Sequence, residues 1–409
     1  MVRELERVSQ SSEFPQTAPA ANPVFFRTYS RRTEGGRETW GEVCDRTLRG
    51  LIQLGELLPQ EAAIIDRMQR QIKALPSGRW LWVGGSEWIE NPQNFSGAYN
   101  CTSTNVLDWR AFGLMMDLAM MGCGTGAVLE PKYINQLPPI RNRLVVTMQG
   151  DIGTTPAQLR CELTEVKIES HQATIYVGDS RQGWVKSYQT LLELSTDEQF
   201  SGEVQVVIDL KNVRPAGEPL KGFGGVANPI KLPELYQRCA SILNKAVGRQ
   251  LNSVECCLLI DEAAVVVVAG NVRRSAGMRQ GDSNDKPFAN AKGNLWEQDA
   301  QGNWRIDPER DALRMANHTR VFHHKPELSE CIEAVKKQYY SGEGAIQWAG
   351  EALARANSDL LTALEVKTDF IKAYEQGNAT DWFHKNYPNL PADEIEHRLQ
   401  RVGLNPCGK

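Results

Sequence analysis

The sequence predicts an α/β fold, and three observations lead to this prediction. The chain has 409 residues, which is enough for two or three domains. Apolar residues make up 41% and charged residues 23% of the chain, which is the balance of a globular protein. Stretches typical of strands alternate with stretches typical of helices, and this alternation favours a sheet covered by helices.

The charge balance and the lack of long apolar runs argue against a nucleic-acid-binding protein and a membrane protein. Lysine and arginine number 46 against 50 acids, a net charge of −4, whereas a generic nucleic-acid binder is basic. No apolar run approaches the roughly 20 residues of a membrane helix, and the longest, residues 263–270, fits one buried strand. The first residues include acids and do not resemble a signal peptide. We therefore expect a cytoplasmic protein that binds neither membrane nor nucleic acid.

The cysteines and histidines predict no metal site. Nine scattered cysteines without a C-x-x-C pair argue against a zinc ribbon and against a secreted disulfide framework. His323 and His324 are adjacent and have no acid or cysteine at ligand spacing. We expect most thiols to be buried and inert, and a few to be reactive.

The N-terminal part is predicted to be helical. Residues 1–21 are polar and rich in Ser, Pro and Ala, which is typical of a disordered leader. Apolar residues recur at helical spacing over 40–75, and Pro59 divides this stretch into two helices. Residues 22–90 therefore form the predicted helical region.

The middle of the chain changes character twice. Within 91–139, a helix is expected over 112–121. Residues 140–210 are expected to form an inserted α+β subdomain. Its predicted elements are strands at 144–148, 173–177 and 204–208 and a helix at 184–194.

The rest of the chain, residues 211–409, is expected to return to the α/β pattern. A helix over 232–251 leads to the buried strand already noted, and a polar loop follows over 270–293. From there to about residue 400 the pattern is mostly helical, with a buried-looking segment at 344–348.

Glycine-rich segments are candidates for ligand binding. The run Gly-Cys-Gly-Thr-Gly at 122–126 fits either a phosphate cradle or close backbone packing beside a helix. The loop 212–225 combines Arg214 and Lys221 with several glycines, and the loop from residue 270 carries Arg273 and Arg274. Loops that bind ligands gather at one edge of an α/β sheet, so these two loops are consistent with a nucleotide site. The alternative is that their cations are solvated surface charges.

The turn at 403–409 holds the sharpest local signal. Cys407 lies on a tight turn between Pro406 and Gly408 and follows Asn405 closely. A thiol presented in this way is a candidate reactive group, and a buried inert cysteine is the alternative.

Together these segments resemble the adenosylcobalamin-dependent (class II) ribonucleotide reductases, and more narrowly their monomeric ribonucleoside-triphosphate branch. The segments that carry the resemblance are Asn100-Cys101, 212–225, 268–276 and 405–408, with 22–32 and 178–184 in support. The resemblance implies the N-terminal part of a ten-stranded α/β barrel. In that arrangement 91–139 starts the barrel, and 211–409 continues it to a finger loop.

The resemblance also implies catalytic roles. Cys407 matches the cysteine whose thiyl radical abstracts the 3′-hydrogen of the ribose, and Asn405 matches an amide that hydrogen-bonds the substrate. Cys101 matches the first of two cysteines that supply electrons and are re-reduced by a thioredoxin-like protein. The implied cofactor is adenosylcobalamin, and the implied substrate is a ribonucleoside triphosphate.

Regulatory roles follow from the same resemblance. The insertion at 140–210 matches an allosteric subdomain for a deoxynucleotide effector, with Asp108 as an effector-binding acid and Arg214 and Lys221 as phosphate partners. The residues that match the family's specificity loops are Gly224, Gly225, Asn271, Arg273 and Arg274.

The chain departs from the family at Lys409, where family members carry the Glu that is the proposed proton acceptor. The second redox cysteine and the rest of the barrel have no counterpart in this sequence. We therefore expect an incomplete part, inactive by itself, that a complementing polypeptide or splicing of an intein would complete. Two alternatives stay open: a glycyl-radical-type reductase half and a non-catalytic nucleotide-binding regulatory fragment.

Overall fold

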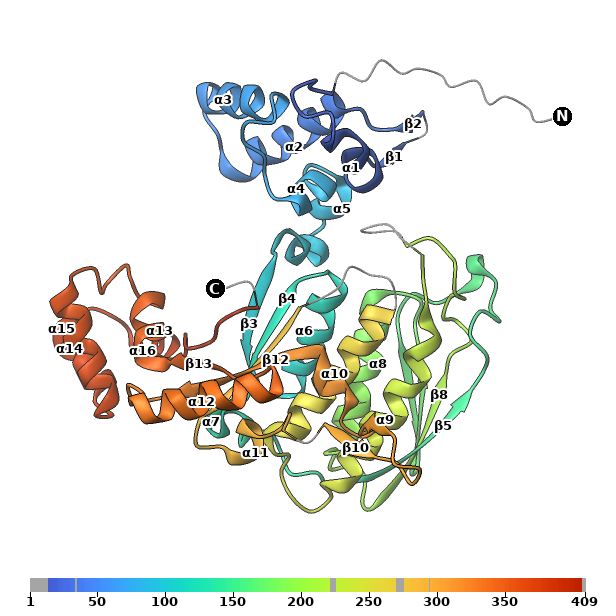
Figure 1. Ribbon diagram of the computed structural model, residues 1–409. Helices are drawn as coiled ribbons and strands as arrows, with labels where there is room; N and C mark the ends of the chain where they lie inside the picture. The colour runs from blue at the N-terminus through green and yellow to red at the C-terminus, as the bar shows by residue number, and fades with distance from the viewer. Residues whose placement is uncertain (1–13, 34, 221–225, 270–275, 294, 407–409) are drawn as a thin grey trace. The chain divides into compact units, whose positions relative to one another are not determined.

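The computed structural model describes residues 14–33, 35–220, 226–269, 276–293 and 295–406. The described chain divides into two compact units, one up to Asn100 and one from Cys101 onward (Figure 1). None of the described helices is long and apolar enough to cross a membrane.

The N-terminal unit is helical, as the apolar spacing over 40–75 predicts. Its helices are α1 (Ala21–Thr28), α2 (Trp40–Gly55), α3 (Pro59–Arg70), α4 (Gly78–Val83), α5 (Glu87–Glu90) and the 3₁₀ helix η1 (Pro92–Ala98), with a short hairpin of β1 (Arg32–Thr33) and β2 (Gly36–Arg37). The prediction that disorder extends to residue 21 is wrong for residues 14–21. Phe14 is buried, with ring centroids 5.5 Å from those of both Phe25 and Trp40, because three aromatic rings form the small core of this unit.

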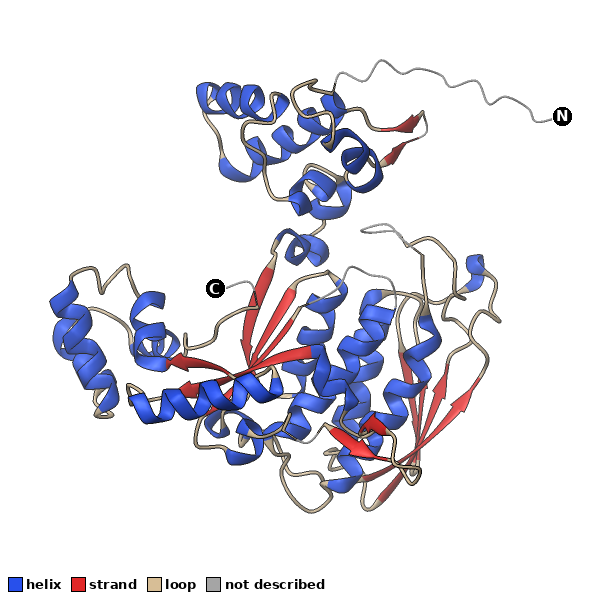
Figure 2. Cartoon of the chain, in the orientation of Figure 1, coloured by secondary structure: helices blue, strands red, loops and turns tan. Residues whose placement is uncertain are grey.

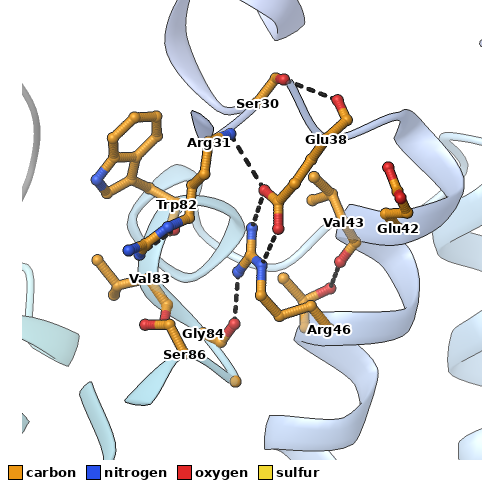
Figure 3. Close-up of polar contacts among 12 residues, drawn as sticks. Ser30, Arg31, Glu38, Glu42, Val43, Arg46, Trp82, Val83, Gly84 and Ser86 are labelled. Atoms are coloured by element: carbon orange, nitrogen blue, oxygen red, sulfur yellow. Dashed lines mark hydrogen bonds and ion pairs between the residues drawn. The ribbon is translucent and has the colours of Figure 1, made fainter. Parts of the chain in front are cut away.

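A buried ion pair joins the hairpin, α2 and the segment after α4. Glu38 accepts hydrogen bonds from Arg46 Nε at 2.7 Å and Nη2 at 2.9 Å, and both side chains are at most 10% exposed. Nη1 of Arg46 bonds the carbonyl oxygen of Gly84 at 2.5 Å (Figure 3). Nη2 also bonds the carbonyl oxygen of Leu81 at 3.1 Å. Each of the three guanidinium nitrogens of Arg46 thus donates at least one hydrogen bond, which lets a charged side chain remain buried.

The second unit is built around a five-stranded parallel sheet. Its order is β13-β12-β9-β4-β3, so β3 and β4, which come first in the sequence within this sheet, lie together at one edge. The strands are β3 (Cys101–Asn105), β4 (Gly124–Val128), β9 (Gly277–Asp282), β12 (Ala316–Phe322) and β13 (Ala345–Trp348). The segment at 344–348, expected only to be buried, contains β13. The prediction of a continuous loop over 270–293 is wrong, because polar Arg279 and Gln280 hide a central strand.

The apolar run at 263–270 is not a strand, and that prediction is wrong. Residues 253–269 form a single helix, α10 (Ser253–Ala269), in which Cys256, Leu259, Ala263 and Val266 are all at most 2% exposed. Apolar side chains lie on every side of the helix, with Asp261 and Glu262 buried among them, because the helix packs against α6 (Trp109–Met120) and α9 (Leu232–Lys245). A short apolar run of this kind has no periodicity that separates a buried helix from a buried strand.

The insertion adds a second sheet, of order β5-β8-β7-β6, in which only β6 is antiparallel. Its strands are β5 (Arg143–Gln149), β6 (Glu165–Glu169), β7 (Gln172–Tyr176) and β8 (Glu203–Asp209), and its helix is α8 (Arg181–Leu194). The predicted elements at 144–148, 173–177, 184–194 and 204–208 are confirmed, whereas β6 is absent from the prediction. A layer of helices that includes α6, α8, α9 and α10 separates the two sheets and shares one core with both (Figure 2).

The last third of the chain covers the β13 edge region with short helices. These are α12 (Leu328–Ser341), α13 (Ala349–Ala356), α14 (Leu364–Glu375), α15 (Ala379–Asn386) and α16 (Ala392–Leu399). Smaller elements precede them: α7 (Pro131–Ile134), α11 (Lys286–Ala289) and the hairpin β10 (Trp296–Gln298) with β11 (Trp304–Ile306). Phe370, Trp382 and Phe383 form an aromatic core for the terminal helices, and Val402 is buried in the same cluster. This core fixes the direction in which the chain leaves α16.

Replacing Glu38 with Gln will destabilise the N-terminal unit by about 3–5 kcal/mol, because it leaves the buried Arg46 charge uncompensated. Hydrogen exchange at the α2 amides measures this loss. The matched control is Asp66→Asn, which breaks a half-exposed pair with Arg70 and should cost less than about 1 kcal/mol. Equal effects of the two substitutions would contradict the importance of the buried pair.

Candidate active site

Two buried glutamines hold the loop that follows α16 against the five-stranded sheet. Gln280 on β9 donates from Nε2 to Oε1 of Gln347 on β13 at 2.5 Å. Gln347 Nε2 then donates to the carbonyl oxygen of Val402 at 2.7 Å, and Gln280 Oε1 accepts from the backbone N–H of Leu404 at 2.8 Å. Both side chains are at least nine-tenths buried, so these hydrogen bonds are protected from competing water.

Near the β3 edge of the sheet, the loop lies in backbone contact with β4. A Cβ atom added at Gly126 would overlap the carbonyl oxygen of Leu404 and lie 3.0 Å from that of Thr102. A Cβ at Gly403 would in turn overlap the hydroxyl of Ser103 on β3. For the run at 122–126, the structure thus favours close backbone packing over a phosphate cradle.

Strand register places the anchors on one face of the sheet. In a parallel sheet, residues paired in register share a face, and so do alternate residues of one strand. One face therefore carries the residues of four registered pairs. These pairs are Cys101↔Gly124, Val128↔Gln280, Gln280↔Thr319 and Val321↔Gln347. We call this the loop face, and define it by Cys101, Ser103, Gly126, Gln280 and Gln347.

The structure therefore places two of the predicted catalytic positions at the loop face. Cys101 is the first residue of β3, lies on the loop face and is disulfide-bonded. Asn405 directly follows the anchored Leu404 and is half-buried. Cys407 lies outside the described residues. Gln280 and Gln347 are absent from the sequence prediction; a buried polar side chain is their only signal, and burial is not visible in a sequence.

Several other cysteines can be set aside as reactive groups. Burial raises the pKa of the Cys44 thiol to about 12, and it raises the pKa values of Cys239, Cys256 and Cys257 above their ordinary range. These thiols are protonated and inaccessible at neutral pH, as the sequence predicts for most of them.

Asp179 of the insertion contacts the loop 212–225, which is predicted to be a specificity loop. Its carboxylate accepts from the backbone N–H and the Nε of Arg214, at 3.0 and 2.8 Å. Arg160 lies 3.5 Å from the same carboxylate and bonds Glu218 in bidentate fashion at 2.6 and 2.8 Å, and its hydrogen bonds lower the pKa of Glu218. Arg214 thus anchors the base of the loop, and its contact with an effector phosphate stays a prediction.

Asp108 has an evident local role as the N-cap of α6. Its Oδ1 accepts from the backbone N–H of Ala111 at 3.0 Å, and its Oδ2 lies 2.8 Å from Arg110. Effector binding by Asp108 stays a prediction. The other predicted effector and specificity residues lie outside the described residues: Lys221, Gly224, Gly225, Asn271, Arg273 and Arg274.

The histidines at 323 and 324 have local partners. His323 lies 2.6 Å from the hydroxyl of Tyr374 and 3.1 Å from the carboxylate of Glu130. Over the described part of the chain, no group of three His, Cys, Asp or Glu side chains is arranged to hold a metal ion.

Comparison with known proteins gives consistent results. Residues 156–243 match the insertion domain of B12-dependent ribonucleotide reductase. The chain is 28% identical to the adenosylcobalamin-dependent ribonucleoside-triphosphate reductase of Lacticaseibacillus paracasei, over 94% of this chain and 52% of that protein. It is 27% identical to a probable reductase of the same name from Dictyostelium discoideum, over 80% of this chain and 42% of that one. The chain thus spans about half the length of the curated relatives it matches.

The fold has a solved counterpart. A crystal structure of a B12-dependent (class II) ribonucleotide reductase superposes with a TM-score of 0.56 and 20% sequence identity. The match covers 73% of this chain and 45% of that chain, and supports the mixed α/β architecture with parallel sheets.

Substituting Gln280 with Leu will release the loop from the sheet. The change removes two hydrogen bonds and leaves the N–H of Leu404 without its acceptor, at a cost of about 1–3 kcal/mol for the unsatisfied group. Hydrogen exchange at 400–406 should accelerate about tenfold or more. Gln338→Leu, on the exposed surface of α12, is the control and should leave this exchange unchanged.

Gly126→Ala tests the same anchoring from the opposite strand. Its new methyl group collides with the loop backbone, so it should also accelerate exchange at 400–406, while Gly35→Ala, which meets no atom within 4 Å, should not. Unchanged exchange in both Gln280→Leu and Gly126→Ala would show that the loop is held by other contacts.

Asp179→Asn will loosen the 212–220 segment. The substitution removes the charge that Arg214 and Arg160 share in a nearly buried cluster, and breaking such a cluster costs about 3–5 kcal/mol. Limited proteolysis should then cleave within 212–220 in the variant and spare the unsubstituted chain. The exposed Asp381→Asn on α15 is the control, and equal resistance of both variants would contradict the anchoring role.

Proposed function

We propose that this chain supplies the N-terminal part of an adenosylcobalamin-dependent ribonucleoside-triphosphate reductase, which makes deoxyribonucleoside triphosphates for DNA synthesis. The observation that carries the proposal is the loop at 402–405, hydrogen-bonded across a parallel sheet on the face that also bears Cys101. Similarity to reductases of this name along as much as 94% of the chain supports it.

The proposed reaction uses three residues of the chain. Cys407 carries a thiyl radical and removes the 3′-hydrogen of the ribose, and Asn405 holds the substrate hydroxyl by a hydrogen bond. Cys101 and a second thiol reduce the sugar, so that the 2′-hydroxyl leaves as water and the two thiols become a disulfide. One ribonucleotide and two thiols thus give one deoxyribonucleotide, one water and one disulfide. Cys407 returns a hydrogen to the 3′ carbon, and part of the abstracted hydrogen exchanges with water through the S–H group before this return. A thioredoxin-like dithiol protein then restores the thiols.

A shielded position is the main contribution of the described residues to this chemistry. Radicals are quenched by solvent and by nearby groups, so a rigid loop on a covered sheet face favours the reaction. The buried glutamine pair fixes the backbone of Val402 and Leu404, and this anchoring fixes where Asn405 begins. In this role Gln280 and Gln347 are positioning residues, which need not contact the substrate.

The described residues offer only part of a corrinoid surface. A depression of about 430 Å³ lies beside the loop and includes Trp348, Arg355, Gly403 and Leu404 in its lining. That volume suits a ligand of drug size, and a corrinoid coenzyme is larger. We therefore propose adenosylcobalamin as the cofactor of the complete enzyme, where it supplies one-electron chemistry, with further walls from outside the described residues.

Completion of the sheet is the second part of the proposal. In the described chain β3 and β13 are edge strands of a parallel sheet, and the unpaired backbone groups of an edge strand are a template for pairing with a further strand. We propose that further strands complete a ten-stranded α/β barrel around the loop face. A continuation of the chain or a complementing polypeptide would supply them, consistent with relatives of about twice the length.

Allosteric control by a deoxynucleotide is the proposed role of the insertion. The match of residues 156–243 to a reductase insertion domain supports this role, and the Asp179 cluster links the insertion to the base of the 212–225 loop. The same observations favour a second candidate function, a regulatory nucleotide-binding fragment without catalysis. We expect the enzyme to be cytoplasmic, where thiols stay reduced.

The native polypeptide that carries residues 1–409, purified with whatever is joined or bound to it, should reduce ribonucleoside triphosphates when adenosylcobalamin and a dithiol are added. Cys101→Ser should lower turnover at least about a thousandfold, because it removes one of the two reducing thiols. Cys331→Ser, on α12, is the control and should retain activity. Deoxynucleotide binding without turnover in the native material would favour the regulatory function, and full turnover by Cys101→Ser would overturn the assigned role of Cys101.

A further inference from the structure

A pocket of about 450 Å³ opens on the outer side of the five-stranded sheet, between β12, α11 and α12. Its walls include His318 and Arg320 of β12, Phe288 of α11 and Lys336 and Tyr340 of α12. The volume lies in the ordinary range of small-molecule sites.

The pocket lies on the sheet face opposite to the loop face. His318 pairs in register with Arg279, and Arg320 pairs with Gly281, so both alternate with the loop-face residue Gln280. Arg279 confirms the direction, because it bonds Asp261 of α10 at 2.7 Å on the helix side of the sheet. The pocket is therefore separate from the candidate active site.

Two buried polar side chains in this pocket have nitrogen atoms without hydrogen-bond partners in the described chain. His318 is 5% exposed and stacks on Phe288 at a centroid distance of 5.0 Å, and neither of its ring nitrogens has a hydrogen-bond partner in the described chain. Arg320 is 8% exposed, bonds the carbonyl oxygen of Ala289 at 3.2 Å through Nη2, and has an unpartnered Nε. Leaving such groups unsatisfied is costly, so their presence points to a ligand.

The charges of the lining favour an anion. Lys292 lies 2.9 Å from Glu343, and Lys337 lies 3.0 Å from Glu333, so both acids of the lining already have cationic partners. Arg320 and Lys336 have no acidic partner within hydrogen-bond range in the described chain and leave the pocket with an excess of two positive charges. Burial, together with Lys292, Arg279 and Arg320, lowers the pKa of His318, so its ring is neutral and offers one donor and one acceptor.

The geometry makes room for the guanidinium and for a flat group. Gly344 has a positive φ of 109°, and a Cβ there would lie 2.8 Å from Nη2 of Arg320, so glycine is needed beside this side chain. Tyr340 is 85% exposed and Trp296 is 60% exposed, and both lie in the lining. Exposed aromatic rings offer faces for stacking a planar ring, and cations without an acidic partner suit a phosphate.

We propose that this pocket binds a phosphate monoester carried on a planar ring, of the size of a nucleoside monophosphate. Arg320 and Lys336 hold the phosphate, His318 supplies a further hydrogen bond from the floor, and Tyr340 or Trp296 stacks on the ring. The site is distinct from both the catalytic loop and the insertion, and it does not depend on the proposed reductase activity.

Isothermal titration of the full chain with adenosine 5′-monophosphate tests the site, with inorganic phosphate as the second probe. We expect one saturable site for the nucleotide and clearly weaker binding of phosphate alone. Arg320→Gln should weaken nucleotide binding about 10- to 100-fold, because it removes a charge-assisted hydrogen bond. Lys336→Gln should weaken it by about threefold to tenfold, since this cation is more exposed.

The controls separate this pocket from other nucleotide sites and from unfolding. Lys385→Gln removes an exposed cation on α15 and should leave the affinity unchanged. Lys336 is exposed, so its variant keeps the test decisive even if Arg320→Gln fails to fold. Absence of saturable binding at millimolar nucleotide, or an affinity that folded Lys336→Gln leaves unchanged, would overturn the site. Phosphate binding as tight as nucleotide binding would overturn the stacking role.

Discussion

The hydrogen bonds of Gln280 and Gln347 to the backbone of the 402–404 segment are the constraint on which the candidate active site depends. Strands β9 and β13 are not adjacent, because β12 lies between them, yet their two side chains meet over it and hold one loop. A parallel sheet buries such side chains away from water, where a satisfied amide pair is rigid and an unsatisfied one is costly. The glycines at 126 and 403 complete the arrangement by letting two backbones touch.

The two faces of this sheet are specialised by simple alternation. One face of the sheet carries Cys101 and the residues that anchor the loop. The alternate residues of each strand face the helices, where the fully buried Arg279 pairs with Asp261. The same alternation carries His318 and Arg320 into a separate outer pocket. Helix packing thus covers one face, and the loop crosses the other. Because the insertion shares a core with the helices between the sheets, a change in its packing can reach the sheet without passing through solvent.

Much of the secondary structure could be predicted from the sequence, whereas the contacts that build the site could not. The helices over 40–75 and the insertion elements follow from apolar periodicity, which is a local property. The run at 263–270 misleads because α10 is buried on nearly every side and so has no exposed polar face. Strand β9 is hidden by Arg279 and Gln280, whose burial depends on distant partners. Gln280 and Gln347 are 67 residues apart, so their pairing follows only from strand order and register. Resemblance to a family located Cys101 and Asn405, but could not show what holds them.

The release of tritium from a ribonucleoside triphosphate labelled at the 3′ position tests the central claim most directly, because only abstraction of that hydrogen frees the label. The native polypeptide that carries residues 1–409, supplied with adenosylcobalamin and a dithiol, should release tritium to water. Cys407→Ser should abolish the release, and Gln280→Leu should slow it about tenfold or more by displacing the loop. Undiminished release of label from Cys407→Ser would contradict a thiyl radical on this loop.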